Sequence, residues 1–254
     1  MLNSYKEKDF AALRGPLESG RQSPSSLAPI FLLCVFLQPL TFFLANYVGG
    51  DETKFTFAFE VKIVHMTLTI ILMIMCIVFA IPKVYAKYER TQYLMGILVI
   101  QNLGAFFGYI GSIYLFESVF EADVSALNRF AAVTLIIGLF VFIITSIRFN
   151  KLLKDGKYRR GGEKDQLRRG FEGKSFTALG IVAGLGIFYT IQAVMTAGTY
   201  LIDWDMVFGT IVGQLIFYAM LFVLPEQLVI LYCKYRFKSF NYKKNGKLYP
   251  FGKE

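Results

Sequence analysis

The sequence is poor in charge, in histidine and in tryptophan. Charged residues make up 18% of its 254 residues, against about 25% in typical soluble domains. There is one histidine and one tryptophan, and the three cysteines form no CxxC pair. These shortages exclude a zinc site built on several histidines and a disulfide-rich secreted module.

Familiar catalytic and nucleotide-binding motifs are missing as well. The chain has no GxSxG, no HExxH and no GxxxxGK[ST] phosphate-binding loop. These motifs place a nucleophile, a metal or a phosphate in a defined geometry, and the sequence shows no other catalytic or nucleotide-binding pattern. The sequence therefore predicts no catalytic residue, no cofactor and no metal, and we expect a non-enzymatic protein.

Long hydrophobic runs dominate what remains, and 55% of the residues are hydrophobic. A helix needs about 20 mostly apolar residues to cross the hydrocarbon core of a membrane. Because lipid offers no hydrogen-bond partner to backbone N–H and C=O groups, such a run must satisfy them internally as a helix. The chain is therefore predicted to be an all-α polytopic membrane protein, a bundle of six transmembrane helices arranged as three hairpins. The predicted spans lie at about 28–48, 61–82, 93–116, 130–147, 176–201 and 206–233.

The basic residues lie on one side of this predicted bundle. Of 27 Lys and Arg, 24 fall in the tail 1–26, the turn 83–92, the loop 148–175 and the tail 234–254. The other side carries three basic and eight acidic residues. The positive-inside rule then places both termini in the cytoplasm. We expect the transmembrane domain, residues 27–233, to lie in the plasma membrane. The net charge of +9 is explained by contact with anionic headgroups and needs no nucleic acid.

The N-terminal tail, residues 1–26, is polar and lacks the early apolar stretch of a signal peptide. Its last residues, SPSS, are typical of a flexible segment. Within the tail, residues 5–13 are predicted to form a short helix on the membrane surface, with Phe10 and Leu13 on one side.

Small residues spaced four apart allow membrane helices to pack closely. GxxxG occurs three times, and one further glycine extends the first stripe along the same face. The predicted packing residues are Gly104, Gly108, Gly111, Gly180, Gly184, Gly209 and Gly213. The alternative is that these glycines are simply common in membrane helices.

The centres of the six segments contain no charged residue, which argues against ion-coupled transport. The best site candidate lies near the inner end of the last span, at Pro225, Glu226 and Gln227. Proline removes a backbone donor and is expected to kink or break the helix there. If it breaks, residues 226–238 become a surface helix whose Lys234 meets headgroups; otherwise Glu226 pairs with a nearby cation.

A second candidate lies at the outer end of the second span, at Glu60, Lys62 and His65. Lys62 and His65 share a helix face, and histidine titrates near neutral pH. A sensor of external pH and an interfacial anchor are the two interpretations, of which the anchor is the simpler.

Three functions fit these observations. The first is a membrane subunit or accessory factor of a transport, secretion or self-protection complex, in which the loop 148–175 docks an acidic partner surface. The second is a stand-alone or oligomeric transporter or channel. The third, with least support, is a membrane enzyme that modifies lipid.

Overall fold

The computed structural model describes residues 4–48, 53–166, 204–243 and 245–252. Within them the chain is helical apart from turns and one isolated β-bridge between Tyr242 and Leu248. Five stretches are long and apolar enough to cross a membrane: Pro24–Tyr47, Ala58–Ala80, Glu89–Phe120, Val124–Lys154 and Met206–Arg236. The all-α polytopic fold is confirmed. The predicted span at 176–201 lies outside the described residues, so the count of six stays a prediction.

The helices begin and end where local chemistry allows. Helix α2 (Pro24–Phe43) starts four residues before the predicted span because the Ser23 side chain accepts a hydrogen bond from the Ser26 amide at 3.2 Å. Proline occupies its first position, where no donor is needed. The SPSS stretch is therefore a helix start rather than a flexible segment. The helix continues into a π-helical turn, η3 (Leu44–Val48).

Helix α7 (Val124–Lys154) is longer than the predicted span for a similar reason. Asp123 caps its first turn by accepting from the Ala126 amide at 2.7 Å. Its 31 residues extend over about 46 Å, which exceeds the roughly 30 Å of hydrocarbon. One or both ends of α7 therefore project beyond an untilted membrane core.

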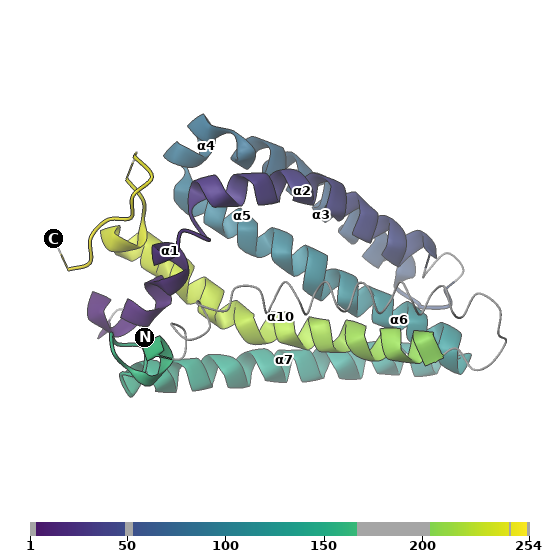
Figure 1. Ribbon diagram of the computed structural model, residues 1–254. Helices are drawn as coiled ribbons and strands as arrows, with labels where there is room; N and C mark the ends of the chain where they lie inside the picture. Colours follow the sequence, from purple (N-terminus) through teal and green to yellow (C-terminus); the bar gives the residue numbers. More distant parts are fainter. Residues whose placement is uncertain (1–3, 49–52, 167–203, 244, 253–254) are drawn as a thin grey trace.

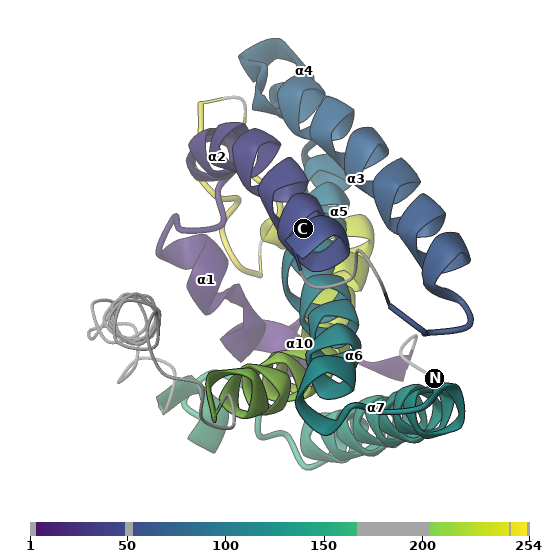
Figure 2. The ribbon, with the colours of Figure 1, turned by 90° about the vertical axis from the view of Figure 1, so that its right-hand side faces the viewer.

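The spans form two groups that share one helix (Figure 1). In the first group α2 packs along α3 (Ala58–Ala80), which leads through the short α4 (Pro82–Lys87) to α5. In the second group α6 and α7 pack against α10 (Trp204–Arg236). The third span belongs to both groups, as the end-on view in Figure 2 also shows. It runs from α5 (Glu89–Gln101) through the π-helix η4 (Asn102–Phe106) into α6 (Phe107–Phe120).

Backbone contact between glycines brings α6 and α10 together. A Cβ on Gly108 would lie 2.7 Å from the carbonyl oxygen of Gly213. A Cβ on Gly213 would lie 2.7 Å from the carbonyl oxygen of Gly108. Gly104 and Gly209 lie nearly as tightly against Met220 and Leu115, with would-be contacts of 2.9 Å. These four glycines thus lie where no larger residue fits without movement.

The other predicted packing glycines behave differently. A Cβ on Gly111 would meet nothing within 4 Å, so Gly111 does not extend this contact. Gly180 and Gly184 lie outside the described residues. Gly138 on α7, which the sequence did not single out, has a would-be Cβ 2.7 Å from the ring of Phe217 on α10.

Both termini fold into a small domain at one end of the bundle, which we call the cap. It consists of residues 5–23, 155–166, 237–243 and 245–252 and includes η2 (Glu7–Arg14), α1 (Gly15–Glu18) and η5 (Lys238–Phe240). Its hydrophobic core contains Phe10, Leu13 and Phe240, none of which is exposed. Phe10 and Leu13 therefore pack against protein and not against the membrane surface.

The glycine contact predicts a difference between two substitutions on the same helix. Gly108→Ala forces a methyl group onto a backbone oxygen, which costs about 1 to 3 kcal/mol. Gly111→Ala adds a methyl group in open space and improves helix propensity. We expect Gly108→Ala to lower the thermal unfolding temperature in detergent and Gly111→Ala to leave it equal or raise it. Equal melting of the two variants would contradict the contact.

Candidate functional site

A cavity of about 400 Å³ lies between the cap, α7 and α10. This volume is within the range of small-molecule sites in proteins. Two of the sequence-predicted residues, Glu226 and Gln227, line it from α10. Tyr93 of α5 and Tyr158 of the cap form other parts of the wall. We call this space the capped-end cavity.

Helix α10 carries Glu226 and Gln227 without a break. It is continuous from Trp204 to Arg236, with the buried Pro225 inside it, so the separate surface helix at 226–238 does not form. One reason is that α10 is held from the side. Gln101 of α5 donates from Nε2 to the Met220 carbonyl oxygen at 3.3 Å, one turn before the proline, and to Gln227 Oε1 at 3.5 Å.

Cationic side chains reach the cavity from two further elements. Arg148 comes from α7, and Lys164 comes from the cap. Gln22, just before α2, also lines the cavity, and its buried Oε1 has no hydrogen-bond partner among the described residues. Two cations, one carboxylate and an unused acceptor thus surround the same space. These groups can bind a polar or charged solute, and no nucleophile with an adjacent base accompanies them among the described lining residues.

A smaller apolar cavity of about 110 Å³ adjoins the first, and we call it the slot. Its walls come from α2 and α5 and include Phe31, Gly96 and Ile97. Gln22, Tyr93 and Gln227 line both spaces, so the slot begins where the capped-end cavity ends.

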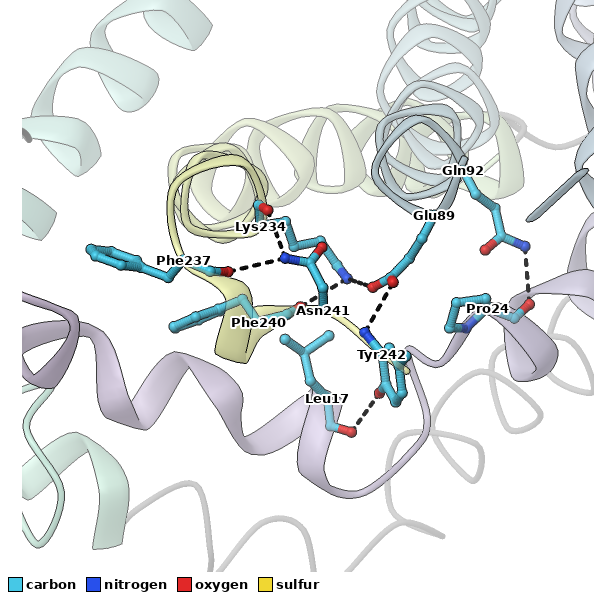
Figure 3. Close-up of polar contacts among 9 residues, drawn as sticks. All are labelled: Leu17, Pro24, Glu89, Gln92, Lys234, Phe237, Phe240, Asn241 and Tyr242. Carbon is cyan, nitrogen blue, oxygen red and sulfur yellow. Dashed lines mark hydrogen bonds and ion pairs between the residues drawn. The ribbon is translucent and has the colours of Figure 1, made fainter. Parts of the chain in front are cut away.

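A buried ion pair lies beneath the cap (Figure 3), with the Lys234 ammonium 5.5 Å from the centre of the Tyr93 ring. Lys234 of α10 is 1% exposed and donates to Glu89 Oε1 at 2.5 Å and to the Phe240 carbonyl oxygen at 3.0 Å. Glu89 also accepts from the Tyr242 amide through Oε2 at 2.9 Å. The prediction that Lys234 meets headgroups is therefore wrong, because the lysine is enclosed by its own chain.

The same network ties the two ends of the chain together. The Tyr242 hydroxyl donates to the Leu17 carbonyl oxygen at 2.5 Å, as Figure 3 shows. Burial raises the pKa of Tyr242, and nearby Glu89 raises it further, so the phenol keeps the proton that it donates. Arg14 NH2 donates to the Tyr249 carbonyl oxygen at 3.0 Å. Lys234 and Glu89 thus organise the floor of the cap.

Neutral polar groups connect the first three spans at membrane depth. Asn102, the first residue of η4, donates from Nδ2 to Gln38 Oε1 of α2 at 2.5 Å and to Thr69 Oγ1 of α3 at 3.4 Å. All three are at most 3% exposed. Because lipid supplies no alternative partners, such bonds hold the helices in one register.

His65 is buried in the bundle rather than placed at its surface. It is fully buried, and its Nδ1 accepts from Asn46 Nδ2 at 3.0 Å. The rings of Phe42 and Phe106 lie 5.2 and 5.0 Å from the imidazole. Neither the external pH sensor nor the interfacial anchor fits a histidine that solvent does not reach.

The two other residues of that candidate lie apart from His65. The Lys62 ammonium is 3.8 Å from the centre of the Tyr47 ring, which fits a cation held at the helix end. Glu60 is exposed. The structure therefore brings no site together from Glu60, Lys62 and His65.

Sequence reasoning missed several groups that the fold brings to the cavity and the cap. Arg148 and Lys164 looked like two of many basic loop residues, and Gln22 like part of a polar tail. One usable signal was present for the ion pair. Glu89 is the single acid in the turn 83–92, which carries three basic residues at a membrane edge.

The described residues hold no group of three or more His, Cys, Asp or Glu that could bind a metal ion. Comparison with known proteins gives no lead: no family model, curated protein or solved structure matches this chain. The function must therefore be argued from the geometry.

The ion pair predicts that its two partners are coupled. Lys234→Met leaves the Glu89 carboxylate without its cation in a partly enclosed place, which costs about 3 kcal/mol. We expect a large fall in unfolding temperature and faster proteolysis of residues 237–252. Glu89→Gln combined with Lys234→Met removes the unpaired charge and restores part of the stability. If the double variant is as unstable as the sum of both single changes, the coupling is refuted.

Proposed function

We propose that this chain is a non-enzymatic membrane subunit or accessory factor of a larger transport, secretion or self-protection complex. In this proposal the capped end faces the cytoplasm and the bundle spans the plasma membrane. The observation that carries the proposal is the cap, because three segments far apart in sequence fold into a packed domain on one end of the bundle.

The cap has features of a docking platform. Phe10, Leu13 and Phe240 lie in one buried cluster with side chains of α5, α7 and α10, so the cap is held against the bundle. A surface held in this way binds a partner with little loss of conformational entropy.

The charges on the cap side favour an acidic partner. Lys151 and Lys154 are exposed at the end of α7 that meets the cap, and Arg160 is exposed within the cap. The neighbouring Arg159 and Lys157 are already engaged with Asp9 and Glu163, at 2.9 and 2.6 Å. Exposed basic residues accelerate the approach of an acidic surface and lose that effect at high salt.

A stand-alone or oligomeric transporter is the second candidate, and the capped-end cavity favours it. A few charged and polar groups in a mainly apolar lining are typical of a solute site. Solute flux in liposomes that contain this chain alone would favour the transporter over the accessory factor. A lipid-modifying enzyme has less support, since Glu226 is the one carboxylate among the described lining residues and acid–base chemistry commonly uses a pair.

The first experiment is to purify the tagged protein from its own host in a mild detergent and to determine the mass of the intact particle. We expect a second protein at a fixed ratio. Changing Lys151, Lys154 and Arg160 to glutamate is expected to release it. The same change to glutamate at Lys83 and Lys87, two exposed basic residues of α4 outside the cap, is the control and should leave the partner bound.

A particle that contains this chain alone, as monomer or homo-oligomer, would refute the accessory proposal. Retention of the partner by the triple variant would place the contact elsewhere than on the cap. Circular dichroism and thermal unfolding of each variant check that these surface changes leave the bundle intact.

A further inference from the structure

The capped-end cavity and the slot differ in chemistry although they adjoin. The larger space has Arg148, Lys164 and Glu226 among mainly apolar lining residues, whereas the described lining of the smaller one has aliphatic and aromatic side chains such as Phe31 and Ile97 and no charged side chain. A solute that is polar throughout would leave the slot empty. A wholly apolar solute would leave the three charged groups of the larger cavity without a partner. The combined shape suits a molecule with one polar and one apolar end.

The polar end of this site carries a net positive charge. Arg148 and Lys164 supply two cations, and Glu226 is the one acidic side chain among the described lining residues. An arginine matches the oxygens of a phosphate with paired donors. The partnerless Oε1 of Gln22 needs a donor, because a buried acceptor left unsatisfied costs about 1 to 3 kcal/mol. A phosphate with a nearby hydroxyl satisfies both requirements.

The apolar end lies within the span region, where acyl chains are. Ile30 of α2 and Ile100 of α5 line the slot and are 48% and 47% exposed, so its rim meets the lipid-facing surface. Gly96 lines the slot, and a Cβ there would be 3.8 Å from the Phe31 ring, an ordinary contact, so a methyl group has room. A leucine side chain at this position would extend beyond that Cβ into the slot.

We propose that the capped-end cavity and the slot together bind one anionic glycerophospholipid with a hydroxyl-bearing headgroup. Its phosphate lies by Arg148 and Lys164, its headgroup hydroxyl donates to Gln22, and the first part of one acyl chain enters the slot. This site uses none of Lys151, Lys154 and Arg160, the residues proposed to dock a partner, so either proposal can fail without the other.

The experiment measures lipid retention by native mass spectrometry. The full-length protein is purified in a mild detergent, and dioleoyl phosphatidylglycerol or dioleoyl phosphatidylcholine is titrated in. We expect one phosphatidylglycerol per chain and at least tenfold weaker retention of phosphatidylcholine. Arg148→Gln combined with Lys164→Gln is expected to weaken phosphatidylglycerol binding at least tenfold. Lys83→Gln combined with Lys87→Gln, which removes as much charge from exposed sites at the helix α4, should not.

A second pair of variants tests the apolar end. Gly96→Leu is expected to reduce retention, and Gly96→Ala, whose methyl group has room, is expected to keep it. Thermal unfolding shows whether each variant is folded. If Gly96→Leu does not fold, the soluble headgroup glycerophosphoglycerol replaces it as a probe: because it has no chain, it should compete poorly with the lipid.

Three results would overturn the proposal. Equal retention of both lipids would show that the charge of the headgroup is not recognised. Equal retention by wild type and the Arg148, Lys164 double variant would show that the lipid binds elsewhere. Full displacement by inorganic phosphate or by glycerophosphoglycerol would show a site for a free anion and not for a lipid.

Discussion

The passage of the third span from one helix group to the other is the constraint on which the bundle depends. At this crossing the helix widens into the π-turn η4, a feature that often accompanies functional sites. Two adjacent residues at this crossing, Gln101 and Asn102, form side-chain hydrogen bonds to different helix groups. Asn102 bonds to α2 and α3, and Gln101 bonds to α10. In lipid these bonds fix how far the two groups can slide or rotate against each other.

Much of this fold is predictable from the sequence because the membrane leaves few alternatives. Long apolar runs must be helices there, and four of the five observed spans were placed to within about four residues, whereas Val124–Lys154 extends six and seven residues beyond its predicted ends. The errors lie at the ends, where Ser23 and Asp123 act as caps that hydropathy ignores. The cap itself was not predictable, because apolar residues in a short amphipathic segment look the same whether lipid or protein covers them. What covers Phe10 and Leu13 is a protein core that includes Phe240, which lies more than 200 residues away in the sequence.

The candidate site was predictable in part for similar reasons. A carboxylate beside a proline near a membrane edge is conspicuous in any sequence, and Glu226 and Gln227 do line a cavity. The rest of the lining comes from other helices and the cap, whose meeting point depends on tertiary packing. His65 shows the opposite failure. Its position suggested an interface, but aromatic neighbours from α2 and η4 enclose it, and hydropathy cannot show which face of a helix is covered.

The bonds between the chain ends also impose an order on folding. Tyr242 bonds to Leu17, and Arg14 bonds to Tyr249, across more than 220 residues. During synthesis the segment with Arg14 and Leu17 emerges first, yet its partners lie more than 220 residues further along the chain. Until then the apolar side chains of η2 and α1 lack their final cover. A chain that stopped before Phe240 would keep them uncovered, and exposed apolar surface of this kind is prone to aggregate.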